Sequence, residues 1–141
     1  MYSAISWIDD DYPGRLGVMA RPRGGDWLDD EIQALHHAGV AVLVSFLTAS
    51  EQFALDLTDE ADACATHQIA FYTLPIPDRQ VPPLTAETVA FVRDLVRQRE
   101  QGKQVVLHCR MGIGRSALGA ACILVMLGMN PSDALYRIAQ A

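Results

Sequence analysis

The chain lacks any apolar run long enough to cross a bilayer. Its longest stretch almost free of charge, residues 116–137 with Asp133 inside it, holds only about a dozen strongly apolar residues, fewer than the ~20 that a membrane span needs. The N-terminal segment SWIDDDYPG also lacks the positive charge and the apolar region of a signal peptide. These absences predict a cytoplasmic protein without a membrane span, in which the apolar run forms a buried helix.

Paired cysteines and dense basic stripes are absent as well. Three cysteines without paired spacing are typical of free thiols in a reducing compartment rather than of a disulfide framework. The chain has no dense Lys/Arg stripe of the kind that binds nucleic acid, so we expect no nucleic-acid partner. Because the histidines lack ligand spacing with any cysteine or carboxylate cluster, we expect no metal and no other cofactor.

What the chain does have is the composition of one globular domain, which we expect to span residues 1–141. Half of the 141 residues are apolar and 20% are charged. Residues 1–62 carry 12 acidic and 3 basic side chains, a balance of −9, whereas residues 63–141 carry 5 acidic and 8 basic ones, a balance of +3. This asymmetry fits two differently solvated faces and, equally well, a second half that faces an anion.

The hydrophobic pattern alternates between helices and buried strands. Helices are expected over 27–39 with Asp26 as N-cap, over 50–68 with a possible break, from the N-cap Thr85 to Gly102, over 116–128, and after Asn130-Pro131. Buried strands are expected over 40–48, 69–76 and 103–109, with one or two edge strands in the first twenty residues. Such alternation predicts an α/β fold with a central, mostly parallel sheet of four to five strands and helices on both faces. In these sheets ligands bind beyond the carboxyl ends of the strands.

One segment, VVLHCRMGIGRS at residues 105–116, places chemistry at such a strand end. A loop between a strand and a helix N-terminus can turn successive N–H groups toward an anion, and Gly112 and Gly114 let the backbone curl inward without Cβ clashes. The guanidinium fork of Arg115 can hold two phosphate oxygens, and the same field stabilises Cys109 as a thiolate. We therefore expect a thiolate nucleophile aimed at a bound phosphorus atom. The expected phosphate-binding residues are Arg110, Met111, Gly112, Ile113, Gly114 and Arg115.

The order His-Cys, five loop residues, Arg and Ser in HCRMGIGRS resembles the signature of the cysteine-dependent protein tyrosine phosphatases, in particular the small dual-specificity phosphatases of the atypical, bacterial type. The general acid of that family lies on a loop about thirty residues before the cysteine, and Asp78 in LPIPDRQVPP lies 31 residues before Cys109. The segments SWIDDDYPGRLGVMARP and HAGVAVLVSFLT are similar to the opening of small members. The resemblance spans nearly the whole chain and implies a protein-tyrosine-phosphatase-like fold.

The resemblance also implies roles for the site residues. Cys109 would form a cysteinyl-phosphate intermediate, Asp78 would protonate the leaving group and later deprotonate water, and Ser116 would donate a hydrogen bond to the departing sulfur. His108 would brace the loop rather than transfer protons. Without a long insert to build a deep pocket, the implied substrates are phosphotyrosine and phosphoserine or phosphothreonine of proteins. Phosphate, sulfate or vanadate would be site ligands.

Alternatives stay open at this point. Arg110 is similar to a basic position of inositol-lipid phosphatases, but Ile113 stands where those enzymes have a second loop lysine. A phosphoinositide or nucleotide substrate is one alternative, and a rhodanese-like sulfurtransferase or a phosphate-binding pseudoenzyme is another. A Cys109–Cys64 disulfide would match a redox switch of some relatives; otherwise Cys64 and Cys122 are expected to be core thiols.

Overall fold

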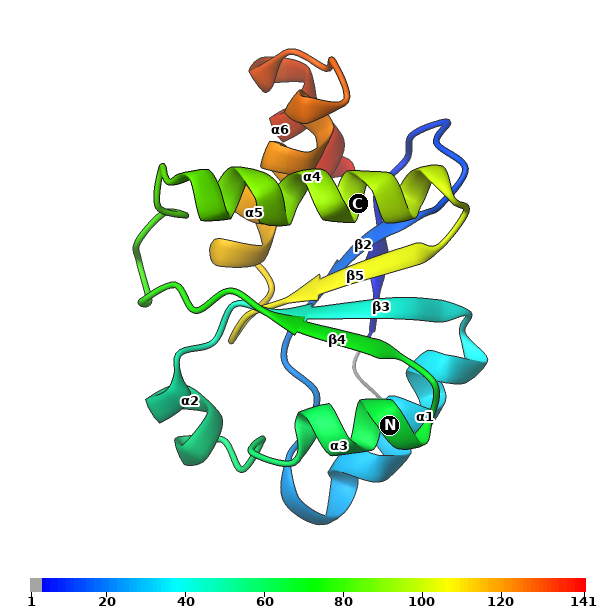
Figure 1. The fold of residues 1–141 in the computed structure, drawn as a ribbon, viewed down its shortest axis with the longest axis vertical. Coiled ribbons are helices and arrows are strands. Elements are labelled where there is room, and N and C mark those ends of the chain that lie inside the picture. The colour runs from blue at the N-terminus through cyan, green and yellow to red at the C-terminus, as the bar shows by residue number, and fades with distance from the viewer. Residues whose placement is uncertain (1–3) are drawn as a thin grey trace.

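A computed structural model describes residues 4–141 as a five-stranded sheet between two layers of helices (Figure 1). The strands are β1 (Ser6–Trp7), β2 (Leu16–Met19), β3 (Val40–Ser45), β4 (Ala70–Thr73) and β5 (Gln104–His108). The helices are η1 (Gly25–Trp27), α1 (Leu28–His37), α2 (Ala49–Ala54), α3 (Glu60–Thr66), α4 (Ala86–Glu100), α5 (Arg115–Met126) and α6 (Pro131–Gln140). The strand order is β1-β2-β5-β3-β4, and only the β1–β2 pair is antiparallel. The predicted fold class is therefore confirmed.

The middle of the sheet is formed by β5 and its neighbour β3, whose continuous apolar runs are covered on both faces. Residues 42–44 and 105–107 are fully buried, as expected for central parallel strands. The parallel register places His108 beside Ser45 on one side and beside Met19 on the other. The carboxyl ends of β2, β3 and β5 therefore meet at one edge of the sheet, which is where the chemistry was expected.

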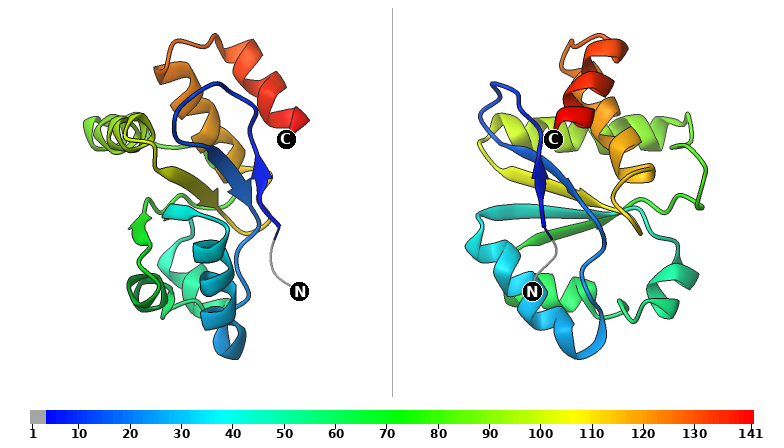
Figure 2. Two further views of the ribbon diagram at one scale, coloured as in Figure 1. Left: turned by 90° about the vertical axis from the view of Figure 1, so that its right-hand side faces the viewer. Right: turned by 180° about the vertical axis from the view of Figure 1, so that it is seen from behind.

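The two helical layers enclose separate apolar cores. Helices α1 and α3 cover one face of the sheet, and α4, α5 and α6 lie on the other (Figure 2). Along β5, Val105 and Leu107 belong to the core under α4 and α5, whereas Val106 belongs to the core under α1 and α3. Because side chains alternate along a strand, His108 points into the α1/α3 layer and Cys109 into the other.

Most helix ends follow the sequence signals. The Thr85 hydroxyl accepts a hydrogen bond from the Thr88 amide at the start of α4, and Asn130 accepts one from the Asp133 amide at the start of α6. Gly102 ends the α4 segment with a φ of +85°, a conformation that favours glycine. Among the helices of residues 4–141, none combines the length and the apolarity that crossing a membrane requires.

Three expected details are wrong. Asp26 is not an N-cap, because the chain enters α1 through the 3₁₀ helix η1, to which Asp26 itself belongs. Of the one or two edge strands expected in the first twenty residues, β1 does lie at the edge of the sheet, but β2 lies inside it, between β1 and β5. Cys122 is exposed, because one side of α5 faces an open apolar groove instead of the core. Cys64 is buried, as expected.

Candidate active site

The loop of residues 109–114 joins β5 to α5 at the carboxyl edge of the sheet (Figure 1). The Gly112 amide donates a hydrogen bond to Cys109 Sγ at 3.3 Å. Although Cys109 is only 2% exposed, its sulfur thus faces the amides of the loop. This is the orientation that a nucleophile under a bound oxyanion requires.

The environment of Cys109 favours the thiolate. Burial by itself raises the thiol pKa, but hydrogen bonds from the Ser116 hydroxyl and from the amides of Ser116, Gly112 and Met111 outweigh it, so the pKa of Cys109 lies below its ordinary value. The Ser116 hydroxyl is buried, and among residues 4–141 no group other than the Cys109 sulfur is placed to receive its proton. Because a hydroxyl hydrogen rotates freely, it can turn toward the sulfur as negative charge develops there.

Glycine is required at one of the two loop positions where it was predicted to matter. Gly112 has a φ of +78°, and a Cβ there would lie 2.6 Å from the Met19 carbonyl carbon and 2.7 Å from the Ala20 amide nitrogen. The loop therefore packs directly on the end of β2, where the Arg21 amide also donates to the Arg110 carbonyl at 3.3 Å. Gly114 has nothing within 4 Å of a Cβ, so the expectation that it avoids a Cβ clash was wrong, although its φ of −91° and ψ of −86° lie outside the usual helical and extended regions.

Arg115 is held rigidly although it is the first residue of α5. It is 3% exposed, and its two terminal nitrogens donate to Glu51 Oε1 at 2.6 Å and to Glu51 Oε2 at 2.8 Å. Nη1 also donates to the Ile76 carbonyl at 2.8 Å. These bonds use three of the five guanidinium donors, which leaves Nε–H and one Nη2–H for two oxygens of an oxyanion.

Glu51, the partner that fixes Arg115, was not found from the sequence. It lies in α2, where Glu51 Oε1 accepts from the Thr48 amide and the Thr48 hydroxyl accepts from the Glu51 amide, a capping box. Hydrogen bonding to Arg115 lowers the pKa of Glu51 to about 2, against the opposing effect of burial. The T-x-x-E spacing could have identified the helix start, but the partner of the carboxylate lies 64 residues away in the chain.

Asp78 lies at the mouth of the site. The loop that carries it is anchored at Ile76, whose amide donates to the Phe46 carbonyl at 3.0 Å and whose carbonyl binds Arg115. Asp78 Oδ1 lies 3.7 Å from Arg115 Nη2 and accepts a hydrogen bond from the Arg79 amide at 3.0 Å. The Asp78 side chain is 65% exposed. A carboxyl group here can meet the leaving oxygen of a substrate held by Arg115.

His108 lies behind the loop and is fully buried. Its Nδ1 is 3.3 Å from the Cys109 carbonyl oxygen, and its Nε2 is 2.5 Å from Glu60 Oε2. Glu60, at the start of α3, is the second site-adjacent carboxylate that the sequence did not reveal. The ring therefore contacts the loop from the α1/α3 layer, on the side opposite the sulfur.

Cys64 and Cys109 lie in different parts of the molecule. Cys64 belongs to the α1/α3 core, whereas Cys109 belongs to the core on the other face of the sheet. Burial and the Glu60 carboxylate raise the pKa of Cys64 to about 12, which disfavours the thiolate needed for disulfide exchange. All three cysteines of the chain are free in this structure.

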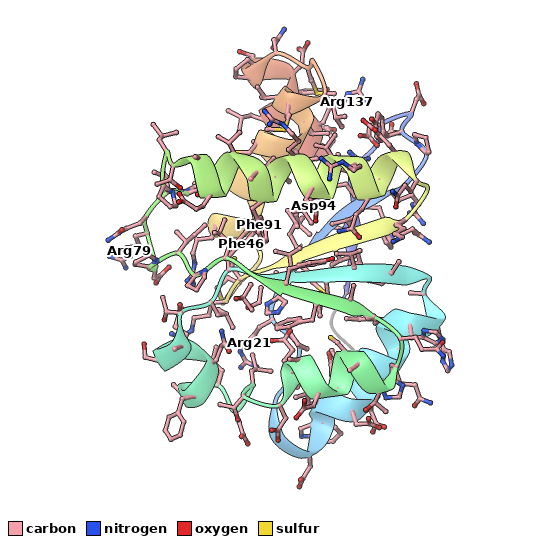
Figure 3. The ribbon with its side chains drawn as sticks, in the orientation of Figure 1. Arg21, Phe46, Arg79, Phe91, Asp94 and Arg137 are labelled. Carbon is pink, nitrogen blue, oxygen red and sulfur yellow. The ribbon has the colours of Figure 1, made fainter. Side chains whose placement is uncertain are left out.

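Arg21 and Arg79 add positive charge at the same edge of the sheet (Figure 3). Arg21 follows β2 and lies next to the loop of residues 109–114, and Arg79 follows Asp78 with a φ of +64°. Arg110, in the loop itself, is exposed as well. The positive second half of the sequence thus contributes most of the cations around the expected phosphate position.

Comparison with known proteins agrees with this geometry. The family model described as PTP-SAK, Swiss Army Knife protein, DSP-PTPase phosphatase domain, matches residues 3–140. A protein of Invertebrate iridescent virus 3 that is named as a tyrosine phosphatase is 32% identical over 117 residues, which cover 77% of this chain and 44% of that protein. Cyclin-dependent kinase inhibitor 3 of Sus scrofa is 27% identical over 142 residues, covering 93% of this chain and 66% of that protein. The chain thus spans about half to two thirds of the length of these curated relatives.

Solved structures share the fold. Kinase-associated phosphatase, with its catalytic-site cysteine replaced by serine, superimposes with a TM-score of 0.90 at 22% identity, covering 99% of this chain and 84% of that one. PTPMT1 superimposes with a TM-score of 0.74 at 21% identity, covering 96% and 82%. Since the family model covers nearly all of the described residues and the cysteine loop curls around its sulfur as that family requires, the chain belongs to the dual-specificity and tyrosine phosphatase domain family.

Proposed function

We propose that the chain is a cytoplasmic, cysteine-dependent phosphatase that hydrolyses phosphotyrosine and phosphoserine or phosphothreonine of proteins. One observation carries the proposal: the Cys109 sulfur, with a lowered pKa, faces loop amides next to an arginine that has two donors left for an oxyanion. Such a site binds a phosphate group and places a thiolate against its phosphorus atom.

In the first step, the loop amides and Arg115 hold three phosphate oxygens while the Cys109 thiolate attacks phosphorus. The S–P bond forms as the bond from phosphorus to the substrate oxygen breaks. Asp78 gives its proton to that oxygen, so the product leaves as a neutral alcohol or phenol. The enzyme is left with a cysteinyl phosphate and an ionised Asp78.

In the second step, water attacks the cysteinyl phosphate. Asp78 takes a proton from the water as the new P–O bond forms, and the S–P bond breaks to release inorganic phosphate. The electron pair returns to sulfur, where the Ser116 hydroxyl and the loop amides stabilise the thiolate. The cycle needs no metal ion and restores both groups to their starting protonation states.

A protein substrate is supported by the exposure of the loop around the site. Met111 and Ile113 are 68% and 75% exposed, and the Asp78 side chain is 65% exposed, which suits both short and long phosphorylated side chains. The relative named kinase-associated phosphatase supports the same class of substrate.

PTPMT1 is known in complex with PI(5)P, which keeps a phosphoinositide as the second candidate substrate. Ile113 stands at the position where a second basic loop residue would bind additional phosphates of a phosphoinositide. The loop of this chain therefore favours the protein substrate.

The test compares wild type with Asp78→Asn on p-nitrophenyl phosphate and on a phosphoserine peptide, in the presence of EDTA. Wild type should hydrolyse both with a mildly acidic optimum, because the thiolate and the protonated acid must coexist. Asp78→Asn should lose on the order of 10² in kcat on the peptide and clearly less on p-nitrophenyl phosphate, whose leaving group needs little protonation.

Cys109→Ser should abolish turnover on both substrates. Asp94→Asn is the matched control, because Asp94 lies on α4, where it forms an exposed ion pair with Arg97 and accepts a hydrogen bond from Gln98 of the same helix (Figure 3). Turnover that survives Cys109→Ser, or that depends on a divalent ion, would refute the proposal. A rate on PI(5)P far above the peptide rates would select the second candidate instead.

A further inference from the structure

A buried carboxyl–imidazole pair lies directly behind the catalytic loop, residues 109–114. Glu60 and His108 are 1% and 0% exposed, and Glu60 Oε2 lies 2.5 Å from His108 Nε2. Both side chains occupy the α1/α3 layer, whereas the Cys109 sulfur faces the other way. The two-step reaction makes no use of the Glu60 carboxylate. A charged carboxylate buried at this depth without a partner would be strongly destabilising, so its presence needs another explanation.

The hydrogen-bond partners determine where the protons lie. A backbone carbonyl oxygen can only accept, so His108 Nδ1, 3.3 Å from the Cys109 oxygen, must carry a proton. At Nε2, a second proton is shared with Glu60, whichever of the two atoms holds it. Glu60 thereby stabilises the form of the ring in which Nδ1 is a donor, as carboxylates do for histidines in other catalytic sites.

That donor acts on the peptide from which the loop starts. The Cys109 carbonyl belongs to the same peptide unit as the Arg110 amide, and the amides of Met111 and Gly112 that face the sulfur follow within the next two residues. If the Cys109 carbonyl loses its donor, this peptide can rotate and the amides turn away from the sulfur and the phosphate. An error of about 1 Å in such a site costs roughly 10²-fold in rate.

We propose that Glu60 is a positioning residue of the catalytic loop: through His108 it fixes the Cys109 carbonyl and so keeps the loop amides aimed at the sulfur and the bound phosphate. The proposal rests on the proposed function of Cys109. Glu60 itself touches neither the substrate nor the sulfur. Cys64, one helical turn from Glu60, stays neutral because its pKa is about 12, so it does not compete for the ring.

The experiment uses Glu60→Gln and Glu60→Met in the full chain, and it measures alkylation of Cys109 by iodoacetamide as a function of pH together with kcat and KM. Glu60→Met leaves Nε2 without a partner, so the alkylation midpoint should move toward that of an ordinary thiol, and kcat should fall by about 10-fold or more. Glu60→Gln should keep most of the wild-type behaviour, since its amide can donate to Nε2 while Nδ1 still donates to the carbonyl.

Asp10→Asn is the matched control. Asp10 forms an ion pair with a buried partner, Arg99, at 2.8 Å near the amino end of β5, so its loss should lower stability without moving the alkylation midpoint. A folded Glu60→Met protein with an unchanged midpoint and an unchanged kcat would overturn the proposal. So would an alkylation shift of equal size in Asp10→Asn.

A second measurement needs no variant. Nitrogen-15 NMR of wild type should show that His108 Nδ1 carries a proton that exchanges slowly with solvent; an unprotonated Nδ1 would overturn the proposal even if Glu60→Met failed to fold. Alkylation and NMR report on the loop without turnover. If wild type showed the lowered thiol pKa and the Glu60 effect but hydrolysed no phosphomonoester, the proposed function would fail and the positioning role would stand.

Discussion

At the scale of single residues, the site depends on carboxylates that orient its cation and its histidine. Glu51 binds two nitrogens of Arg115, which leaves the guanidinium only one face to offer a substrate. Without Glu51, Arg115 would keep its charge, but its guanidinium would no longer be held in one orientation. Bidentate binding of phosphate oxygens needs that orientation, so the Glu51–Arg115 pair matters for catalysis as well as for stability.

We predict that Glu51→Gln lowers kcat/KM by on the order of 10²-fold, because the Arg115 fork would no longer be held in line with the phosphate oxygens. Steady-state kinetics on p-nitrophenyl phosphate measures this. Glu87→Gln, an exposed substitution in the first turn of α4, serves as the control and should leave kcat/KM unchanged. Equal values of kcat/KM for wild type and Glu51→Gln would mean that Arg115 keeps its orientation without the Glu51 carboxylate, which would contradict the prediction.

The same carboxylate makes stability depend on pH. The pKa of Glu51 falls from its ordinary 4.5 to about 2 in the folded chain, so the unfolded chain binds a proton more readily. The stabilisation is therefore complete above about pH 5 and is lost as the pH falls toward 2. Urea unfolding at a series of pH values should show this loss in wild type and a smaller loss in Glu51→Gln. Parallel curves for the two proteins would contradict the assignment.

At the scale of elements, the catalytic loop is shaped by its contact with β2 as much as by its own sequence. Of its two glycines, only Gly112 adopts a positive φ and lies against the backbone of Met19 and Ala20. The glycine-rich spacing predicted a curled loop correctly. It could not show which glycine the curl requires, because that depends on a strand about ninety residues earlier in the chain.

We predict that Gly112→Ala destabilises the fold by about 1–3 kcal/mol, because alanine would be strained at this φ and would collide with the end of β2. Gly114→Ala, with open space and an ordinary φ, should change stability by less than about 0.5 kcal/mol. Chemical denaturation compares the two. If the two variants were equally stable, the close approach of the loop to β2 would not exist in solution.

Helices α2 and α5 show what sequence patterns can and cannot predict for an element. The apolar run of α5 indicated a helix correctly. Because apolar residues occur on nearly all sides of this helix, the sequence did not predict which side faces solvent, where Cys122 is exposed. Conversely, the excess of acidic residues over 1–62, a segment that includes α2 and the start of α3, fits a solvated face. Glu51 and Glu60 within it are largely buried, because each pairs with a side chain from a distant element, Arg115 at the start of α5 and His108 at the end of β5.

At the scale of the whole molecule, the parallel sheet brings the parts of the site together. The alternation of helices and strands predicted this sheet, and the resemblance of HCRMGIGRS predicted which strand end matters. Partners on either side of the loop come from segments 48 and 64 residues away, so no local pattern contains them. Only the tertiary fold determines these long-range pairs.

The central claim is that Cys109 carries the phosphoryl group during turnover, and trapping that intermediate tests it most directly. Wild type and Ser116→Ala would be mixed with a phosphotyrosine peptide, quenched in acid within milliseconds, digested and analysed by mass spectrometry. We predict one added phosphoryl group on the peptide that contains Cys109, in larger amount in Ser116→Ala because the thiolate then leaves more slowly. A phosphoryl group on another residue, or turnover with no phosphorylated protein at any time, would contradict the account.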